Sequence, residues 1–210
     1  MTRNKGRGPR RSARAAGTRE RIIDAAAQLL GDKGYGATSL DEVAEVAGLT
    51  KSTVYYHFDS KEDIYAAVVY PRVISATKQA LAILDENEDP RMALELLFAA
   101  IIRRARDPSQ KYMYYTEMLP LSEETRRAIR SAQQEYEARV AQVIRAGQEQ
   151  GQFMQGDAKV LAQIVIGTVA RTARWYNTEG PVGPEEFSEA LLSLLLHGIE
   201  GGRETAGTAS

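Results

Sequence analysis

Apolar residues in the stretch Leu40–Ala47 recur every three or four positions, which is the spacing of one face of a short helix. Ser39 and Glu42 stand three apart, as in a capping box, so this helix is expected to begin directly after Ser39. Thr50 is then placed to cap a second short helix, Lys51–His57. The pattern therefore predicts two short helices joined by a tight turn.

The same helical spacing predicts seven further helices, and no strand pattern or repeat appears. Because a proline inside a helix removes a hydrogen bond and crowds the preceding turn, the helix that contains Pro71 is expected to be kinked or split there. The expected fold class is all-α with about nine helices. The further ranges are about Thr18–Lys33, a fourth helix from Lys61, then Pro90–Arg106, Ser109–Met118, Ser122–Glu149, Asp157–Tyr176 and Pro184–Glu200.

The second short helix carries hydrogen-bonding groups and aromatic rings on all faces but one. Val54 supplies its apolar face, and the other positions hold Lys51, Ser52, Thr53, Tyr55, Tyr56 and His57. A helix-turn-helix pair that offers such a surface to the major groove reads DNA. An ordinary helical hairpin with a polar exposed face has the same spacing, so spacing alone leaves both interpretations open.

Composition narrows the classes of protein to consider. The 210-residue chain has no cysteine, so a disulfide framework and a thiolate metal site are excluded. No apolar run approaches the roughly 18 residues of a membrane span, and the basic N-terminus lacks the apolar segment of a signal peptide. A cytoplasmic protein with no membrane partner is expected.

Positive charge is concentrated at the N-terminus. Residues 1–21 hold eight Arg or Lys residues and one acidic residue, whereas the whole chain has a formal net charge of −1. The first 17 residues lack apolar periodicity and are expected to form a disordered basic arm. This arm either follows the DNA backbone or acts only as a solubilising tail.

Catalysis is not expected from this sequence. The two histidines, His57 and His197, lie in no nucleophile or metal-ligand pattern, and the sequence contains no Gly-rich phosphate loop. No cofactor and no metal site are therefore predicted.

Residues 18–65 resemble the DNA-binding domain of the tetracycline-repressor (TetR) family of bacterial regulators. The residues that carry the resemblance are Ile22–Ala26, Leu29, Gly34-Tyr35, Thr38-Ser39, Val43-Ala44, Ala47-Gly48, Lys51–Phe58 and Ser60–Glu62. The family implies an all-helical homodimer with an N-terminal DNA-binding domain and a C-terminal domain that binds an effector and dimerises. The expected division is a basic arm at 1–17, a helix-turn-helix domain at 18–65, an effector-binding and dimerisation domain at 66–200, and a disordered tail at 201–210.

The resemblance and the helix-turn-helix pattern together assign the DNA-contacting residues. Phosphate contacts are predicted for Thr38, His57 and Lys61, the last beside the backbone N–H groups that begin the fourth helix. Thr50, which caps the reading helix, is assigned to the same DNA-contacting surface. Base reading is predicted for Lys51, Ser52, Thr53, Tyr55 and Tyr56.

The last two helices are apolar around most of their circumference, which is more apolar surface than one small domain covers. They are expected to form a four-helix interface between two copies of the chain, with burial inside one copy as the alternative. Two-fold symmetry would place two reading helices about 34–36 Å apart on a palindromic operator. The predicted interface residues are Leu161, Val165, Thr168, Leu191, Leu194, Leu195 and Gly198.

Residues 117–153 and 170–199 resemble TetR-family regulators that sense acyl-CoA thioesters and control lipid or steroid breakdown. Arg171 and Trp175 stand four apart on one helix face, where a guanidinium beside an indole suits a phosphate next to an adenine ring. The same pair also fits simple stacking or a place in the dimer seam. The predicted effector site consists of Phe98, Arg103, Tyr112, Tyr115, Met118, Arg171 and Trp175.

The functional prediction is therefore a repressor that leaves its operator when an acyl-CoA thioester binds. One alternative is the same regulator sensing a lipophilic drug in efflux control. An alternative from another class is a helical ligand-binding scaffold that does not bind DNA.

Overall fold

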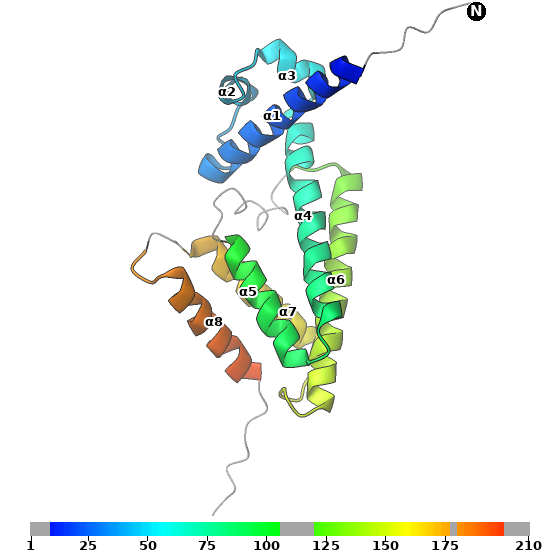
Figure 1. Cartoon of the computed structure of the whole chain (residues 1–210), viewed down its shortest axis with the longest axis vertical. Coiled ribbons are helices and arrows are strands. Elements are labelled where there is room, and N and C mark those ends of the chain that lie inside the picture. The colour runs from blue at the N-terminus through cyan, green and yellow to red at the C-terminus, as the bar shows by residue number, and fades with distance from the viewer. Residues whose placement is uncertain (1–8, 106–119, 177–179, 200–210) are drawn as a thin grey trace, which may run out of the picture. The chain divides into compact units, whose positions relative to one another are not determined.

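The computed structural model describes residues 9–105, 120–176 and 180–199, and in these ranges all regular secondary structure is helical (Figure 1). The all-α prediction is confirmed, with eight helices in the described residues. The helix expected at Ser109–Met118 lies outside them. The chain divides into two compact units: unit 1 comprises Met1–Val73 with Pro108–Arg127, and unit 2 comprises Ile74–Asp107 with Ala128–Ser210.

Unit 1 is built from three helices and the beginning of a fourth. The second helix packs against both the first and the third. Side chains from all four helices, among them Ile22, Val43, Val54 and Ile64, have no exposed surface. The helices are α1 (Pro9–Lys33), α2 (Leu40–Val46), α3 (Lys51–His57) and α4 (Lys61–Glu86), labelled in Figure 1.

The first helix begins at Pro9, earlier than the expected start near Thr18. Residues 9–17, assigned to a disordered arm, are helical here. Proline fits the first turn of a helix, and the arginines and alanines that follow it are good helix formers, so local propensity accounts for the earlier start. The helix ends where the N–H of Gly34, at φ 77°, donates to the Leu30 carbonyl at 3.1 Å.

The predicted helix-turn-helix is confirmed in its local details. Ser39 caps α2 by the expected capping box with Glu42, and the Thr50 side chain accepts a hydrogen bond from the Thr53 N–H at 3.2 Å at the start of α3. Between the two helices Gly48 has φ 62°, a conformation in which a Cβ would be strained. The geometry of the turn is therefore determined by local signals, namely two helix caps and one glycine.

Pro71 does not split its helix, because α4 runs without a break from Lys61 to Glu86. Proline leaves the preceding turn short of one backbone donor. The Arg72 guanidinium donates to the Val68 carbonyl at 2.9 Å, next to the Ala67 carbonyl that Pro71 leaves without a backbone donor.

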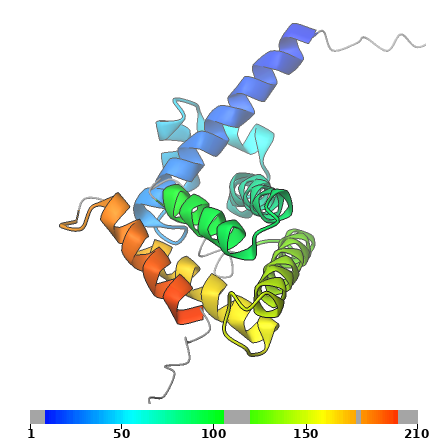
Figure 2. The ribbon, with the colours of Figure 1, turned by 60° about the horizontal axis from the view of Figure 1, so that its bottom comes forward.

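Unit 2 packs the second half of α4 with four more helices around one core. Figure 2 shows α5 beside α7 and α8, the two helices that it contacts. Leu84, Phe98 and Val140 are completely buried in this core. The helices are α5 (Pro90–Ala105), α6 (Glu123–Glu149), α7 (Ala158–Trp175) and α8 (Pro184–Ile199). No helix among the described residues is long and apolar enough to span a bilayer.

The turn between α6 and α7 is closed by an aromatic ring. Phe153 is 2% exposed, and its ring lies directly against the Cα of Gly147 on α6. The Gln152 N–H donates to the Gly147 carbonyl at 2.8 Å. A residue without a side chain is required at this point of α6, because the ring occupies the place of a Cβ.

Helices α7 and α8 turn one face to the core of their own chain, which corrects part of the predicted dimer interface. Val165, Leu191 and Leu195 are 1%, 7% and 7% exposed and belong to the core, so they are not free for a partner. Leu161 and Thr168 are half-buried, Gly198 lies in the last turn of α8, and Leu194 is 68% exposed. The most exposed aliphatic side chains among the described residues of α7 are those of Val160 and Ile164, at 52% and 57%. The sequence missed this register because both faces of α7 are apolar.

Candidate nucleic-acid interface and effector region

Helix α3 presents two tyrosines to solvent. Tyr56 is 74% exposed and Tyr55 47% exposed, while Val54 between them and the core is fully buried. Lys51 and Ser52 are also exposed, and Thr53 and His57 are half-buried. The Tyr56 ring meets the His57 ring edge-on, with centroids 5.3 Å apart. This helix therefore offers aromatic surface and hydrogen-bonding groups together, as contacts with base edges require.

Lys51 forms an ion pair with Asp41 of α2, a contact that was not predicted from the sequence. Its Nζ lies 2.7 Å from Asp41 Oδ1 and donates to Oδ2 at 3.0 Å, and the hydrogen bond to this carboxylate raises the pKa of Lys51. Both side chains are more than half exposed, and exposed ion pairs add little stability. DNA can therefore compete with Asp41 for the ammonium group.

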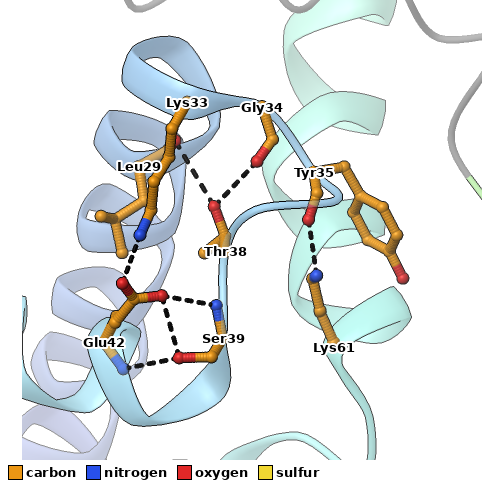
Figure 3. Close-up of polar contacts among 8 residues, drawn as sticks. All are labelled: Leu29, Lys33, Gly34, Tyr35, Thr38, Ser39, Glu42 and Lys61. Atoms are coloured by element: carbon orange, nitrogen blue, oxygen red, sulfur yellow. Dashed lines mark hydrogen bonds and ion pairs between the residues drawn. The ribbon is translucent and has the colours of Figure 1, made fainter.

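Lys61 is oriented into unit 1 (Figure 3). Its Nζ donates to the Tyr35 carbonyl at 2.5 Å and lies 4.0 Å from the centroid of the Tyr35 ring. This contact fastens the start of α4 to the loop that follows α1. Because an ammonium group has three N–H donors, a phosphate contact by Lys61 is compatible with this role and stays a prediction.

The Thr38 hydroxyl, on a residue predicted to contact a phosphate, is directed into the protein, and the phosphate contact stays a prediction. Thr38 is 4% exposed, and its hydroxyl donates to the Gly34 carbonyl at 2.9 Å, as Figure 3 shows. A short hydroxyl side chain readily bonds to a backbone carbonyl four residues earlier, and here this bond supports the turn after α1. Thr50 is exposed, but its hydroxyl caps α3 and lies 2.9 Å from the Ser52 hydroxyl.

Glu42 joins α1, the loop and α2. Its carboxylate pairs with Lys33 of α1 and accepts the Ser39 N–H at 2.8 Å (Figure 3). The Lys33 hydrogen bond first, and then those from Ser39, lower the pKa of Glu42 from 4.5 to about 2. The carboxylate is therefore ionised at neutral pH, and it fixes α2, on which α3 packs, against α1.

The four predicted effector residues that the structure describes differ in exposure. Phe98 is completely buried in the core, whereas Arg103 is exposed in the last turn of α5. Arg171 is exposed and Trp175 is 65% exposed, both on the face of α7 that carries Ile164. Tyr112, Tyr115 and Met118 lie outside the described residues.

An aromatic cluster that sequence reasoning missed surrounds the end of α7. The Tyr176 ring stacks on Phe187 of α8 at a centroid distance of 3.8 Å, and the Trp175 ring meets Phe187 edge-on at 5.8 Å. The Tyr176 hydroxyl donates to the Val182 carbonyl at 3.0 Å. The cluster gives Trp175 a fixed support while most of its surface stays open to solvent.

Replacing Tyr56 by alanine is expected to relax base preference at one position of each operator half-site. A good base contact is worth about 1–3 kcal/mol, so operator affinity should fall by up to about 100-fold per half-site while binding to unrelated DNA is unchanged. Selection from random DNA followed by titration measures both effects. Tyr70→Ala, which removes another exposed tyrosine of unit 1, is the control. An unchanged preferred sequence in Tyr56→Ala would show that Tyr56 reads no base.

Comparisons with known proteins agree with this geometry. Residues 87–199 match the model for the tetracyclin repressor-like C-terminal domain, and residues 22–68 match that for bacterial regulatory proteins of the tetR family. The transcriptional repressor KstR2 of Mycolicibacterium smegmatis is 25% identical over 194 residues, which cover 91% of this chain and 95% of KstR2.

Two solved structures share the fold. A TetR/AcrR-family regulator from Thermobifida fusca is 32% identical, with a TM-score of 0.68 over 86% of this chain and 97% of that one. AibR, crystallised with isovaleryl coenzyme A and operator DNA, has a TM-score of 0.76 at 22% identity over 85% of this chain and 98% of its own. With family models covering both its N-terminal and its C-terminal parts, the chain belongs to the TetR family of bacterial transcriptional regulators.

Proposed function

We propose that this regulator is a repressor that binds a palindromic operator as a homodimer and is released by an acyl-CoA thioester. The observation that carries the DNA-binding part is the exposed surface of α3 within a capped helix-turn-helix. In this proposal unit 1 reads DNA, and residues 66–200 bind the effector and dimerise.

The dimer is proposed to form along the exposed face of α7. Val160, Ile164 and Gly167 share this face, since their spacing brings them onto one side of a helix. Two neighbouring β-branched apolar side chains more than half exposed, next to a glycine that lets backbones approach closely, suit a helix-to-helix contact between two copies.

The choice of effector is supported by one structural neighbour and one chemical feature. AibR, similar in fold, was crystallised with isovaleryl coenzyme A and operator DNA. In this chain the exposed Arg171 guanidinium and Trp175 indole stand one helical turn apart. An arginine binds phosphates by charge-assisted hydrogen bonds and an indole stacks on a purine, so the pair suits the nucleotide part of coenzyme A.

A melting-temperature panel with acyl-CoAs, free CoA, fatty acids and lipophilic cationic drugs tests this choice. A ligand at about 100 times its dissociation constant adds about 2.7 kcal/mol to the free energy of unfolding, which is visible as a rise in Tm. Acyl-CoAs are expected to give this rise, free CoA a smaller one, and drugs none. The same acyl-CoAs should displace the protein from its operator.

The role of Arg171 is tested in the same panel. Arg171→Ala is expected to lose most of the acyl-CoA shift and to keep operator binding, whereas Arg145→Ala, which removes an exposed arginine of α6, should behave as wild type. A rise in Tm with lipophilic drugs alone would favour a regulator of drug efflux instead. Failure to select any operator from random DNA would favour a DNA-independent scaffold.

A further inference from the structure

Arg21 lies at the end of the basic N-terminal stretch, yet its guanidinium contacts the helix-turn-helix. Its Nη2 donates to the Ala47 carbonyl at 2.5 Å and to the Gly48 carbonyl at 3.3 Å. These two carbonyls end α2 and begin the turn that leads into α3. Arg21 therefore joins α1 to the turn, across 26 positions of sequence.

This contact has a clear physical basis. The last carbonyls of a helix have no partner within the helix and carry partial negative charge. A guanidinium is a planar cation with several donors, so one side chain can serve two neighbouring carbonyls. The backbone of the turn also leaves room for it, because a Cβ on Gly48 would lie 3.1 Å from Arg21 Nη2.

Arg19, two residues earlier, makes a different contact. Its guanidinium carbon lies 4.9 Å from the centroid of the Phe58 ring, at the other end of α3. A cation over a ring face keeps its N–H groups available for hydrogen bonds at the edge of the ring. Of these two arginines, Arg19 is therefore suited to a phosphate of DNA, whereas Arg21 directs the N–H groups of its Nη2 to the turn.

The position of the turn controls where α3 lies. Thr50, the cap of α3, follows Gly48 by two residues, so a shift of the turn moves the whole helix. A seven-residue helix is about 10 Å long, and a rotation of about 10° at one end moves the other end by about 2 Å. Base contacts depend on donor–acceptor distances within a few tenths of an ångström. Phosphate contacts from other elements tolerate such a shift.

We propose that Arg21 is a positioning residue for base reading, which holds the turn and thereby orients α3, and that it does not contact a phosphate. This role rests on the proposed DNA-binding function of unit 1. It separates two effects that are commonly assigned together to basic residues before a helix-turn-helix: attraction to the DNA backbone and discrimination between sequences.

The test compares full-length Arg21→Ala, Arg21→Lys and Arg19→Ala on the selected operator and on unrelated DNA, over a range of salt concentrations. Arg21→Ala is expected to lose about tenfold or more in operator affinity, with affinity for unrelated DNA within about twofold of wild type and an unchanged salt slope. Arg21→Lys keeps the charge but lacks the planar guanidinium with its paired donors. It should therefore also lose discrimination between the operator and unrelated DNA. If Arg21 contacted a phosphate, Arg21→Ala would instead weaken binding to both DNAs alike and lower the salt slope by about one per protomer. Arg21→Lys would then largely restore binding.

A second measurement needs no DNA. Hydrogen exchange of the Leu49 and Val54 amides, which donate to the Ala44 and Thr50 carbonyls, should become faster in Arg21→Ala than in Arg19→Ala. Unchanged exchange together with an unchanged ratio of operator to unrelated-DNA affinity would overturn the proposal. Because exchange is measured on the free protein, that result is distinguishable from a wild-type protein that selects no operator.

Discussion

Ile164→Asp is expected to separate the homodimer and to remove most of its operator affinity. Ile164 is 57% exposed on α7, whereas its neighbour Val165 is buried in the core, so the substitution leaves the core of the protomer intact. At a two-fold interface the change occurs twice, and each copy would bury an unpaired carboxylate. Two such losses of about 2 kcal/mol or more raise the dimer dissociation constant on the order of 1000-fold.

Sedimentation over a range of protein concentrations measures the dissociation constant, and circular dichroism checks that the variant is folded. Gln134→Asp places the same charge on an exposed position of α6, away from α7 in sequence, and should remain dimeric. A folded Ile164→Asp protein that dimerises as wild type would show that another surface builds the dimer. Loss of operator binding should follow the loss of the dimer, since one protomer offers one reading helix.

Gly147→Ala is expected to destabilise unit 2 in spite of the higher helix propensity of alanine. Its Cβ would lie 2.1 Å from Cδ2 and 2.3 Å from Cε2 of Phe153, distances at which the ring must move. The alanine gains up to about 1 kcal/mol in a helix, whereas overpacking a closed core costs about 1–3 kcal/mol. Displacing a ring that is 2% exposed adds to this cost, so the net effect is a loss of stability.

Thermal and urea unfolding measure this loss, expected as a fall in Tm of several degrees. Gly17→Ala is the matched control, because Gly17 lies in α1 and has no atom within 4 Å of the position of its Cβ. That variant should keep or gain stability, by about 0.5–1 kcal/mol. If Gly147→Ala is as stable as Gly17→Ala, the Phe153 ring is not fixed against α6.

The helix-turn-helix could be predicted closely because its signals are local. The Ser39–Glu42 capping box, the Thr50 cap and Gly48 each act within about four residues, so their spacing in the sequence already specifies their geometry. The same holds for the N-termini of α5 and α7, where the Asp89 and Asp157 carboxylates accept backbone N–H groups of the first turn.

What the sequence left unresolved depends on contacts between distant residues. Arg21 and Lys61 are ordinary basic residues in a chain rich in them, and their carbonyl partners lie 26 positions away in each case. Helix α7 is apolar on both sides, so periodicity could not tell that Val165 faces the core and Ile164 faces solvent. The inward direction of the Thr38 hydroxyl was likewise not predictable, because the resemblance marks the position of this residue but not the direction of its side chain.

Trp175 is the chain's single tryptophan, and it sits on the exposed face of α7 with Phe187 beneath its edge. Its fluorescence therefore comes from one point of the molecule without any label. A purine stacked on the 65% exposed indole would quench this emission. Effector binding therefore has an optical signature in the unmodified protein, and it can be followed by titration.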